Sequence, residues 1–241
     1  MGKVHLGIPS ALALALKKHF PIRTFVETGT YMGSTALWAA SHFEQVITIE
    51  NSQQIYEQTL ATHGHIANIQ FLFGNSKDVL KQVIPTIESP TLFWLDGHWS
   101  GGITYGKDDQ CPLLEEITIL NTSPINHFLL IDDARLYTSP PNRPCVIAEW
   151  PTIDQVIETI KAGPHEKYIA IFDDVILAFP KAAQEPIAEW LQEANTVSAM
   201  EWQKELQIAQ SGRLRRGAHL IKEGLQLVTE SALAKLQRMR Q

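Results

Sequence analysis

Short apolar segments alternate with longer amphipathic ones through most of the chain. Five apolar segments have the length and composition of buried strands: 23–28, 45–50, 69–75, 91–96 and 127–133. Segments with helical periodicity follow them: 34–43, 52–64, 76–87, 111–120 and 152–162. Such alternation predicts right-handed crossovers and a parallel sheet that is covered by helices on both faces.

The segment 167–179, KYIAIFDDVILAF, departs from this alternation. It is typical of two strands joined by a tight turn at Asp173 and Asp174, and so short a turn requires an antiparallel pair. Aspartate is common in turns because it bonds nearby backbone, so we interpret this pair as structural. The predicted fold is α/β: a doubly wound, mostly parallel, seven-stranded sheet with an antiparallel C-terminal hairpin.

We expect a main domain over residues 1–180 and a mainly helical extension over 181–241. The main domain begins with an amphipathic helix within 1–20, which Ser10 is expected to cap. The extension is too small for a full core of its own, so it is expected to pack on the domain or on a second subunit, as in a homo-oligomer. We expect a small hairpin around Glu223 and a last basic helix in it. Its first helix carries an apolar stripe of Ile187, Trp190, Leu191 and Ala194.

Composition narrows the function classes. The 241 residues carry a net charge of −6, which supplies no basic face for nucleic acid. Cys111 and Cys145 show neither metal-ligand nor disulfide spacing, as expected for a cytoplasmic protein. No segment is long enough to cross a membrane, so no membrane partner is expected.

The first candidate site follows the first predicted strand, in VETGTYMGST. Gly29 and Gly33 permit a sharp turn, and the helix that begins near Ser34 directs its first N–H groups into the same space. The spacing is G-x-x-x-G, whereas a dinucleotide pyrophosphate favours G-x-G-x-x-G. Glu27 would repel a pyrophosphate but suits the ammonium group of a methionine moiety. An NAD site is therefore disfavoured.

Polar residues also follow the second and third predicted strands. Glu50, with Asn51 beside it, can accept hydrogen bonds from both ribose hydroxyls of an adenosine ligand. Asn75 and Ser76 follow the third strand, where an adenine edge could be read. Each residue alone is as typical of a cap or a turn. Together, and in this order, they indicate an adenosine-containing cofactor.

The motifs VETGTYMGST, ITIE and FGNS resemble the first three motifs of the class I S-adenosylmethionine-dependent methyltransferases. The resemblance covers roughly residues 21–180. It implies the Rossmann-like methyltransferase fold and S-adenosylmethionine as cofactor. The cofactor contacts that it implies are Glu27, Gly29, Thr30, Tyr31, Gly33, Ser34, Glu50, Asn51, Asn75, Ser76 and Asp96.

Carboxylates end the fourth and fifth predicted strands, at Asp96 and at Asp132 and Asp133. Neighbouring parallel strands lie about 4.8 Å apart, so these side chains can converge. Gathered carboxylates repel one another unless a cation is present, and hard oxygen ligands suit Mg²⁺. Turn capping is the alternative. LDG and IDD resemble the metal-dependent O-methyltransferases that act on sugars of macrolides and aminocoumarins, which implies that these three aspartates hold Mg²⁺.

A hydroxyl is a poor nucleophile until it loses its proton. His98 is the candidate base, with Asp96 as the alternative. The sequence thus predicts a methyltransferase, with Mg²⁺-assisted O-methylation of a small-molecule hydroxyl, on a sugar or another metabolite. Two alternatives stay open: an NAD(P)-dependent oxidoreductase, and a non-catalytic binding or assembly protein that retains the fold.

Overall fold

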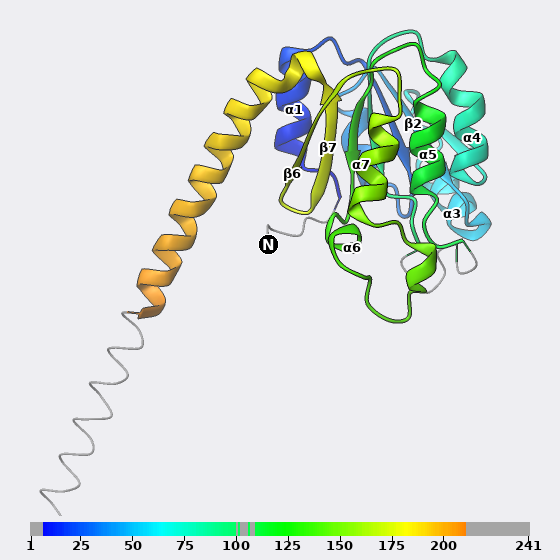
Figure 1. Cartoon of the computed structure of the whole chain (residues 1–241). Helices are drawn as coiled ribbons and strands as arrows, with labels where there is room; N and C mark the ends of the chain where they lie inside the picture. The colour runs from blue at the N-terminus through cyan, green and yellow to red at the C-terminus, as the bar shows by residue number, and fades with distance from the viewer. Residues whose placement is uncertain (1–6, 100, 102–105, 107–108, 211–241) are drawn as a thin grey trace, which may run out of the picture. The chain divides into compact units, whose positions relative to one another are not determined.

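A computed structural model describes residues 7–99, 101, 106 and 109–210 (Figure 1). It contains a seven-stranded sheet in the order β3-β2-β1-β4-β5-β7-β6. The strands are β1 (Thr24–Thr28), β2 (Gln45–Glu50), β3 (Ile69–Phe73), β4 (Thr91–Leu95), β5 (Phe128–Ile131), β6 (Lys167–Phe172) and β7 (Val175–Pro180). β1 to β5 are parallel, whereas β7 runs antiparallel to both β5 and β6. The predicted α/β class and the antiparallel hairpin are confirmed.

Helices connect the strands. They are α1 (Ser10–His19), α2 (Ser34–Ala40), α3 (Gln53–His63), α4 (Ser76–Val83), α5 (Leu113–Leu120), α6 (Arg135–Thr138) and α7 (Ile153–Lys161), with short 3₁₀ turns η1 (Ile84–Thr86), η2 (Ile147–Glu149) and η3 (Lys181–Ala183). The N-cap of α1 is Pro9, and Ser10 is the first helical residue. The expected Ser10 cap is therefore wrong, although the helix itself is present.

The alternation of side chains along β1 shows how the sheet is covered on both faces. Phe25 lies edge-on to Trp38 of α2, with ring centroids 6.4 Å apart. Its neighbour Val26 faces the other way, into the apolar cluster that contains Leu80 of α4 and Ile117 of α5. Because both faces are covered, the central strands are apolar throughout, and all five residues of β4 are buried.

The register brings the carboxyl ends of the central strands to one edge of the sheet. Thr28 lies opposite Ile49 on β2 and Leu95 on β4, and Leu95 lies opposite Ile131 on β5. In open α/β sheets this edge holds the ligand site. The polar residues that follow these strands in the sequence are therefore neighbours in space.

The chain divides into two compact units, Met1–Ala188 and Glu189–Gln241. The described part of the second unit, residues 189–210, is helical, and several of its apolar side chains are exposed, among them Met200, Trp202 and Ile208. The hairpin and the basic helix expected near the C-terminus lie outside the described residues. Within the described residues, no helix is long and apolar enough to cross a membrane.

Candidate functional site

The turn after β1 requires glycine at its first position. Gly29 has φ +86°, in the left-handed region. A Cβ built on Gly29 would lie 2.3 Å from the main-chain oxygen of Asp96, closer than any two such atoms can approach. The turn after β1 and the segment after β4 are thus in direct backbone contact, which brings two of the predicted motifs together.

Glu27 is buried beneath this turn. Its carboxyl accepts a hydrogen bond from the Thr48 hydroxyl on β2 at 2.6 Å, and the Thr30 and Thr48 hydroxyls lie 2.5 Å apart. Burial raises the pKa of Glu27 to about 8, against the opposing effect of the Thr48 hydrogen bond. Glu27 therefore lies in a hydroxyl network below the turn, and its contact with a cofactor ammonium stays a prediction.

Glu50 links the end of β2 to the same turn. Its carboxylate accepts hydrogen bonds from the main-chain N–H of Tyr31 at 2.9 Å and of Ser52 at 2.8 Å. The Tyr31 side chain is 53% exposed, so the residue contributes mainly through its backbone. Two carboxylate oxygens offer about four acceptor positions, so these two main-chain donors do not by themselves exhaust the acceptor capacity of Glu50.

The residues after β3 are engaged by the protein itself. Asn75 caps α4, its side chain accepting a hydrogen bond from the Lys77 N–H at 3.2 Å. Ser76 is buried, and its hydroxyl hydrogen-bonds the Glu116 carboxyl of α5. Asn51 is half-buried and Ser34 is exposed. The adenine contact expected of Asn75 and Ser76 stays a prediction.

Glu116 is a site residue that the sequence did not single out. It is 1% exposed and hydrogen-bonds Ser76 and Thr28, at the carboxyl end of β1. Burial raises its pKa to about 7, although both hydrogen bonds oppose this. Among the described residues, its Oε1 atom has no hydrogen-bond partner. The sequence pattern did not indicate Glu116, because it lies on the buried face of a helix that is otherwise formed by Leu113, Ile117 and Leu120.

The aspartates after β4 and β5 converge on His98. The His98 Nε2 atom lies 3.0 Å from Asp133 Oδ2, and its Nδ1 atom lies 3.6 Å from Asp96 Oδ1. The His98 side chain is 7% exposed, whereas Asp96 is 30% exposed. The predicted convergence of Asp96 and Asp133 therefore occurs, with the imidazole between them.

Two basic side chains face these carboxylates. Burial opposes a charge on His98, but the hydrogen bond to Asp133 and the charges of Asp96, Asp133 and Asp132 outweigh it, so the pKa of His98 is raised. Arg135 donates to Asp133 Oδ1 at 2.6 Å. Burial would raise the pKa of Asp133, but His98 and Arg135 together lower it. Arg135, four residues beyond β5, is a second residue that the sequence did not single out.

Asp132 and Asp96 differ in how far their pKa values are raised. Burial and repulsion by Asp96 and Asp133 raise the pKa of Asp132 to about 8. Burial raises that of Asp96 to about 6, with the His98 charge opposing the shift. The pKa of Asp132 is therefore raised further than that of Asp96, which is the more exposed of the two.

This arrangement does not fit the predicted Mg²⁺ site. His98 and Arg135 offset part of the repulsion that called for a metal, and both oxygens of Asp133 are already hydrogen-bonded. Across the described residues, no group of three or more His, Cys, Asp or Glu side chains is placed to hold a metal ion. Octahedral Mg²⁺ coordination requires carboxylate oxygens that are free to ligate.

Contacts from a distant segment hold the His98 ring in place. The ring packs edge-on against Trp150, with centroids 5.3 Å apart. Gln110 accepts hydrogen bonds from the Trp150 indole at 3.0 Å and from the Val146 N–H at 2.9 Å. The Trp99 N–H in turn donates to the Gln110 carbonyl at 2.8 Å. The segments after β4 and α6 are thereby joined, and these side chains lie too far apart in sequence for a pattern to associate them.

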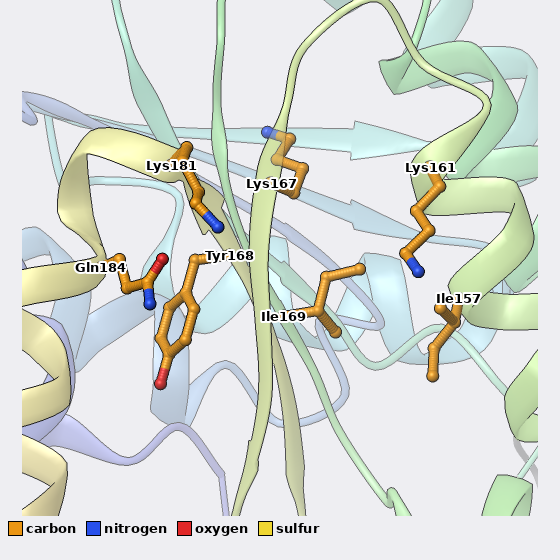
Figure 2. A pocket seen from close by; sticks show the side chains of 7 residues that line it. All are labelled: Ile157, Lys161, Lys167, Tyr168, Ile169, Lys181 and Gln184. Carbon is orange, nitrogen blue, oxygen red and sulfur yellow. The ribbon is translucent and has the colours of Figure 1, made fainter.

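A pocket of about 340 Å³ lies away from this site, beside the edge strand β6 (Figure 2). It is lined by Ile157, Lys161, Lys167, Tyr168, Ile169, Lys181 and Gln184. Lys167 begins β6 and lies opposite Pro180, at the end of the sheet remote from the β1 turn. Its ammonium group donates to the His127 carbonyl at 2.5 Å. None of the predicted site residues lines this pocket.

No protein-family profile matches the chain, and no curated protein matches its sequence. Solved structures are similar in fold. A caffeoyl-CoA O-methyltransferase-like protein from Staphylococcus aureus is 16% identical, over 73% of this chain and 86% of that one, with a TM-score of 0.50. The Podospora anserina methyltransferase PaMTH1, bound to SAH, is 18% identical over 74% and 91%, with a TM-score of 0.45. The first similarity supports a Rossmann-like methyltransferase fold for this chain.

Proposed function

We propose that the chain is an S-adenosylmethionine-dependent methyltransferase that methylates a hydroxyl of a sugar or another small metabolite. One observation carries the proposal: the carboxylate of Glu50 is attached to the Gly29 turn through the Tyr31 N–H, beside the end of β4. A glycine turn, an acceptor for ribose hydroxyls and a polar strand end therefore adjoin one another. This is the edge at which open α/β sheets bind their ligands.

The described residues fit the cofactor. Glu50 retains acceptor capacity for the ribose hydroxyls, and the close backbone approach at Gly29 keeps the floor of the site free of side-chain bulk. Bound S-adenosylmethionine supplies an electrophilic methyl group on a sulfonium and leaves as S-adenosylhomocysteine. In this proposal Glu50 orients the adenosine, and alignment with the acceptor provides most of the acceleration of such a displacement.

Asp96 is the proton acceptor that the geometry favours. Its side chain is the more exposed member of the His98 pair, and its pKa of about 6 suits a base near neutral pH. His98 faces carboxylates with both ring nitrogens, so it acts as an electrostatic partner of Asp96 rather than as the base. As the acceptor oxygen bonds to the methyl carbon, its proton passes to Asp96.

Mg²⁺ assistance receives no support from the described side chains. Asp133, one of the three carboxylates that would ligate the ion, is paired with His98 and Arg135. Proton transfer is therefore assigned to side chains alone. Oxygen as the methylated atom now rests on the Asp96–His98 pair, because a hydroxyl needs such a proton acceptor.

Thermal unfolding with S-adenosylhomocysteine tests the proposal. A ligand at about 100 times its dissociation constant adds about 2.7 kcal/mol, which raises the midpoint by roughly 5–10 °C for a chain of this size. We expect such a rise for the wild type, and little or none for Glu50→Gln. Glu57→Gln, which removes an exposed carboxylate from α3, should behave as the wild type.

The outcomes separate the alternatives. A rise with NAD⁺ but none with S-adenosylhomocysteine would identify an oxidoreductase and overturn the proposal. Binding of S-adenosylhomocysteine without methyl transfer to any compound in a metabolite extract would indicate a non-catalytic protein. A further rise of the unfolding midpoint on adding Mg²⁺ would support a metal site at the three aspartates.

A further inference from the structure

The β6–β7 turn reaches the same edge of the sheet as the candidate site. Because β7 is antiparallel to β5, its first residues lie beside the carboxyl end of β5, with Ile176 opposite Ile131. Asp173 and Asp174 form the turn just before β7. Two residues that sequence patterns assign to turn formation thus lie beside the segment that carries Asp133.

Asp174 binds that segment at three points. Its main-chain oxygen accepts a hydrogen bond from the Ala134 N–H at 2.7 Å. Its Oδ1 atom accepts from the Arg135 N–H at 2.9 Å, and its Oδ2 atom accepts from the Arg135 guanidinium. The Asp174 side chain is 8% exposed, so the carboxylate end of these contacts is buried. A turn aspartate needs none of them to form its own turn.

The contacts continue from Arg135 to the imidazole. The guanidinium nitrogen that Asp174 binds also donates to Asp133 Oδ1 at 2.6 Å. The other oxygen of Asp133 faces His98 Nε2 at 3.0 Å. Asp133 has φ +57°, a backbone conformation that non-glycine residues adopt only when neighbouring contacts hold them there. The contacts from Asp174 to the two following residues provide that support.

We propose that Asp174 is a positioning residue, which orients His98 through Arg135 and Asp133. The inference rests on the proposed function only in taking the Asp96–His98 pair as the proton-accepting group. If the Asp174 charge is lost, Arg135 is held by Asp133 alone or turns toward solvent, to which 38% of its side chain is already exposed. In both cases Asp133 loses the contact that sets its direction toward His98.

The imidazole N–H signal of His98 in nuclear magnetic resonance spectra of the full chain tests this role. The signal is assigned by its absence in His98→Gln. We expect Asp174→Asn to shift or abolish it, because asparagine keeps an acceptor for the Arg135 N–H but removes the charge that holds the guanidinium. The control is Glu166→Gln, which removes a carboxylate from an exposed pair with Lys181, 3.7 Å away, near the start of β6.

A double-mutant cycle separates this route from general damage. Arg135→Gln breaks the same series of contacts at its partly exposed member. As a single variant it should change the His98 signal, and combined with Asp174→Asn it should cause no further change. It also supplies the test if Asp174→Asn does not fold. Additive changes would contradict transmission through Arg135.

Cofactor binding distinguishes failure of the inference from failure of the proposed function. Asp174→Asn should keep the wild-type affinity for S-adenosylhomocysteine, because Glu50 and the Gly29 turn are untouched. An unchanged His98 signal together with normal binding would overturn the positioning role alone. A changed signal in a protein that binds no S-adenosylhomocysteine would support the positioning role and overturn the methyltransferase.

Discussion

The candidate site has two halves, which differ in the groups that contact their carboxyl side chains. At the ends of β1 and β2, Glu27 and Glu50 are satisfied by hydroxyl and main-chain donors. At the ends of β4 and β5, Asp133 is paired with His98 and Arg135, and Asp96 lies 3.6 Å from the His98 ring. Neutral donors leave room for a ligand's own donors, whereas ion pairs hold charges in fixed positions. The first half is suited to binding, and the second to moving a proton.

The largest effect is expected where the two halves meet. Gly29→Ala should reduce the free energy of unfolding by about 3 kcal/mol or more, because the new Cβ would lie 2.3 Å from the Asp96 oxygen. Gly101 has a similar φ of +91°, but a Cβ there would meet no atom of the described residues within 4 Å. Gly101→Ala should therefore cost only about 1 kcal/mol of strain. Equal losses in urea unfolding would mean that backbone strain, and not the contact between the halves, dominates.

The hydroxyl network of the first half should show the next largest effect. Thr48→Val keeps the shape of the side chain but leaves Glu27 without its donor and Thr30 without its partner. Loss of a buried hydrogen bond costs about 1–3 kcal/mol. The exposed Thr62, whose hydroxyl bonds the Gln58 carbonyl, provides the control, and Thr62→Val should change stability by less than about 0.5 kcal/mol. Urea midpoints compare the two variants directly.

The pH dependence of stability should separate the halves further. The pKa of Glu27 is raised from 4.5 to about 8 in the folded protein, so the folded state keeps a proton that the unfolded state releases. Stability therefore falls as pH rises between these values, by up to about 1.4 kcal/mol per pH unit for one such group. Asp132 and Glu116 act in the same direction.

Glu27→Gln should flatten this decline when urea unfolding is measured from about pH 5 to about pH 8. The exposed variant Glu57→Gln should leave the slope unchanged. Asp133 acts in the opposite sense, because its pKa is lowered: its contribution is present above its unfolded pKa and is lost as pH falls through the folded one. A Glu27→Gln protein with the wild-type slope would show that this carboxyl is ionised when buried.

The smallest effect is expected in the ion pairs of the second half. Arg135 is partly exposed, so solvent screens its pairs and Arg135→Gln should cost about 1 kcal/mol. The exposed pair of Arg23 with Glu44, 3.7 Å apart, should contribute less than about 0.5 kcal/mol. Added salt should reduce both costs. A loss for Arg135→Gln as large as that of Gly29→Ala would mean that the second half carries more of the fold than its exposure suggests.

Sequence patterns predicted the strand ends well, for a simple reason. Glu50 is the last residue of an apolar strand, Asp96 and Asp132 come directly after one, and strands that run parallel end at the same edge. The patterns could not predict the partners of these residues. Thr48 and Glu27 are 21 residues apart, and Arg135 and Asp174 are 39 apart. Such pairs are decided by strand order and side-chain direction, which local periodicity does not encode.

The sequence alone determined the class of the fold and the residues that stand where its strands end, because the spacing of apolar positions sets the type and length of each element. Only the tertiary structure decided how those carboxyl groups are satisfied. His98 and Arg135 face Asp133 where a metal ion was expected, and burial raises the pKa of Glu27 and of Asp132. Protonation depends on surroundings assembled from distant segments, so it is a property of the folded chain.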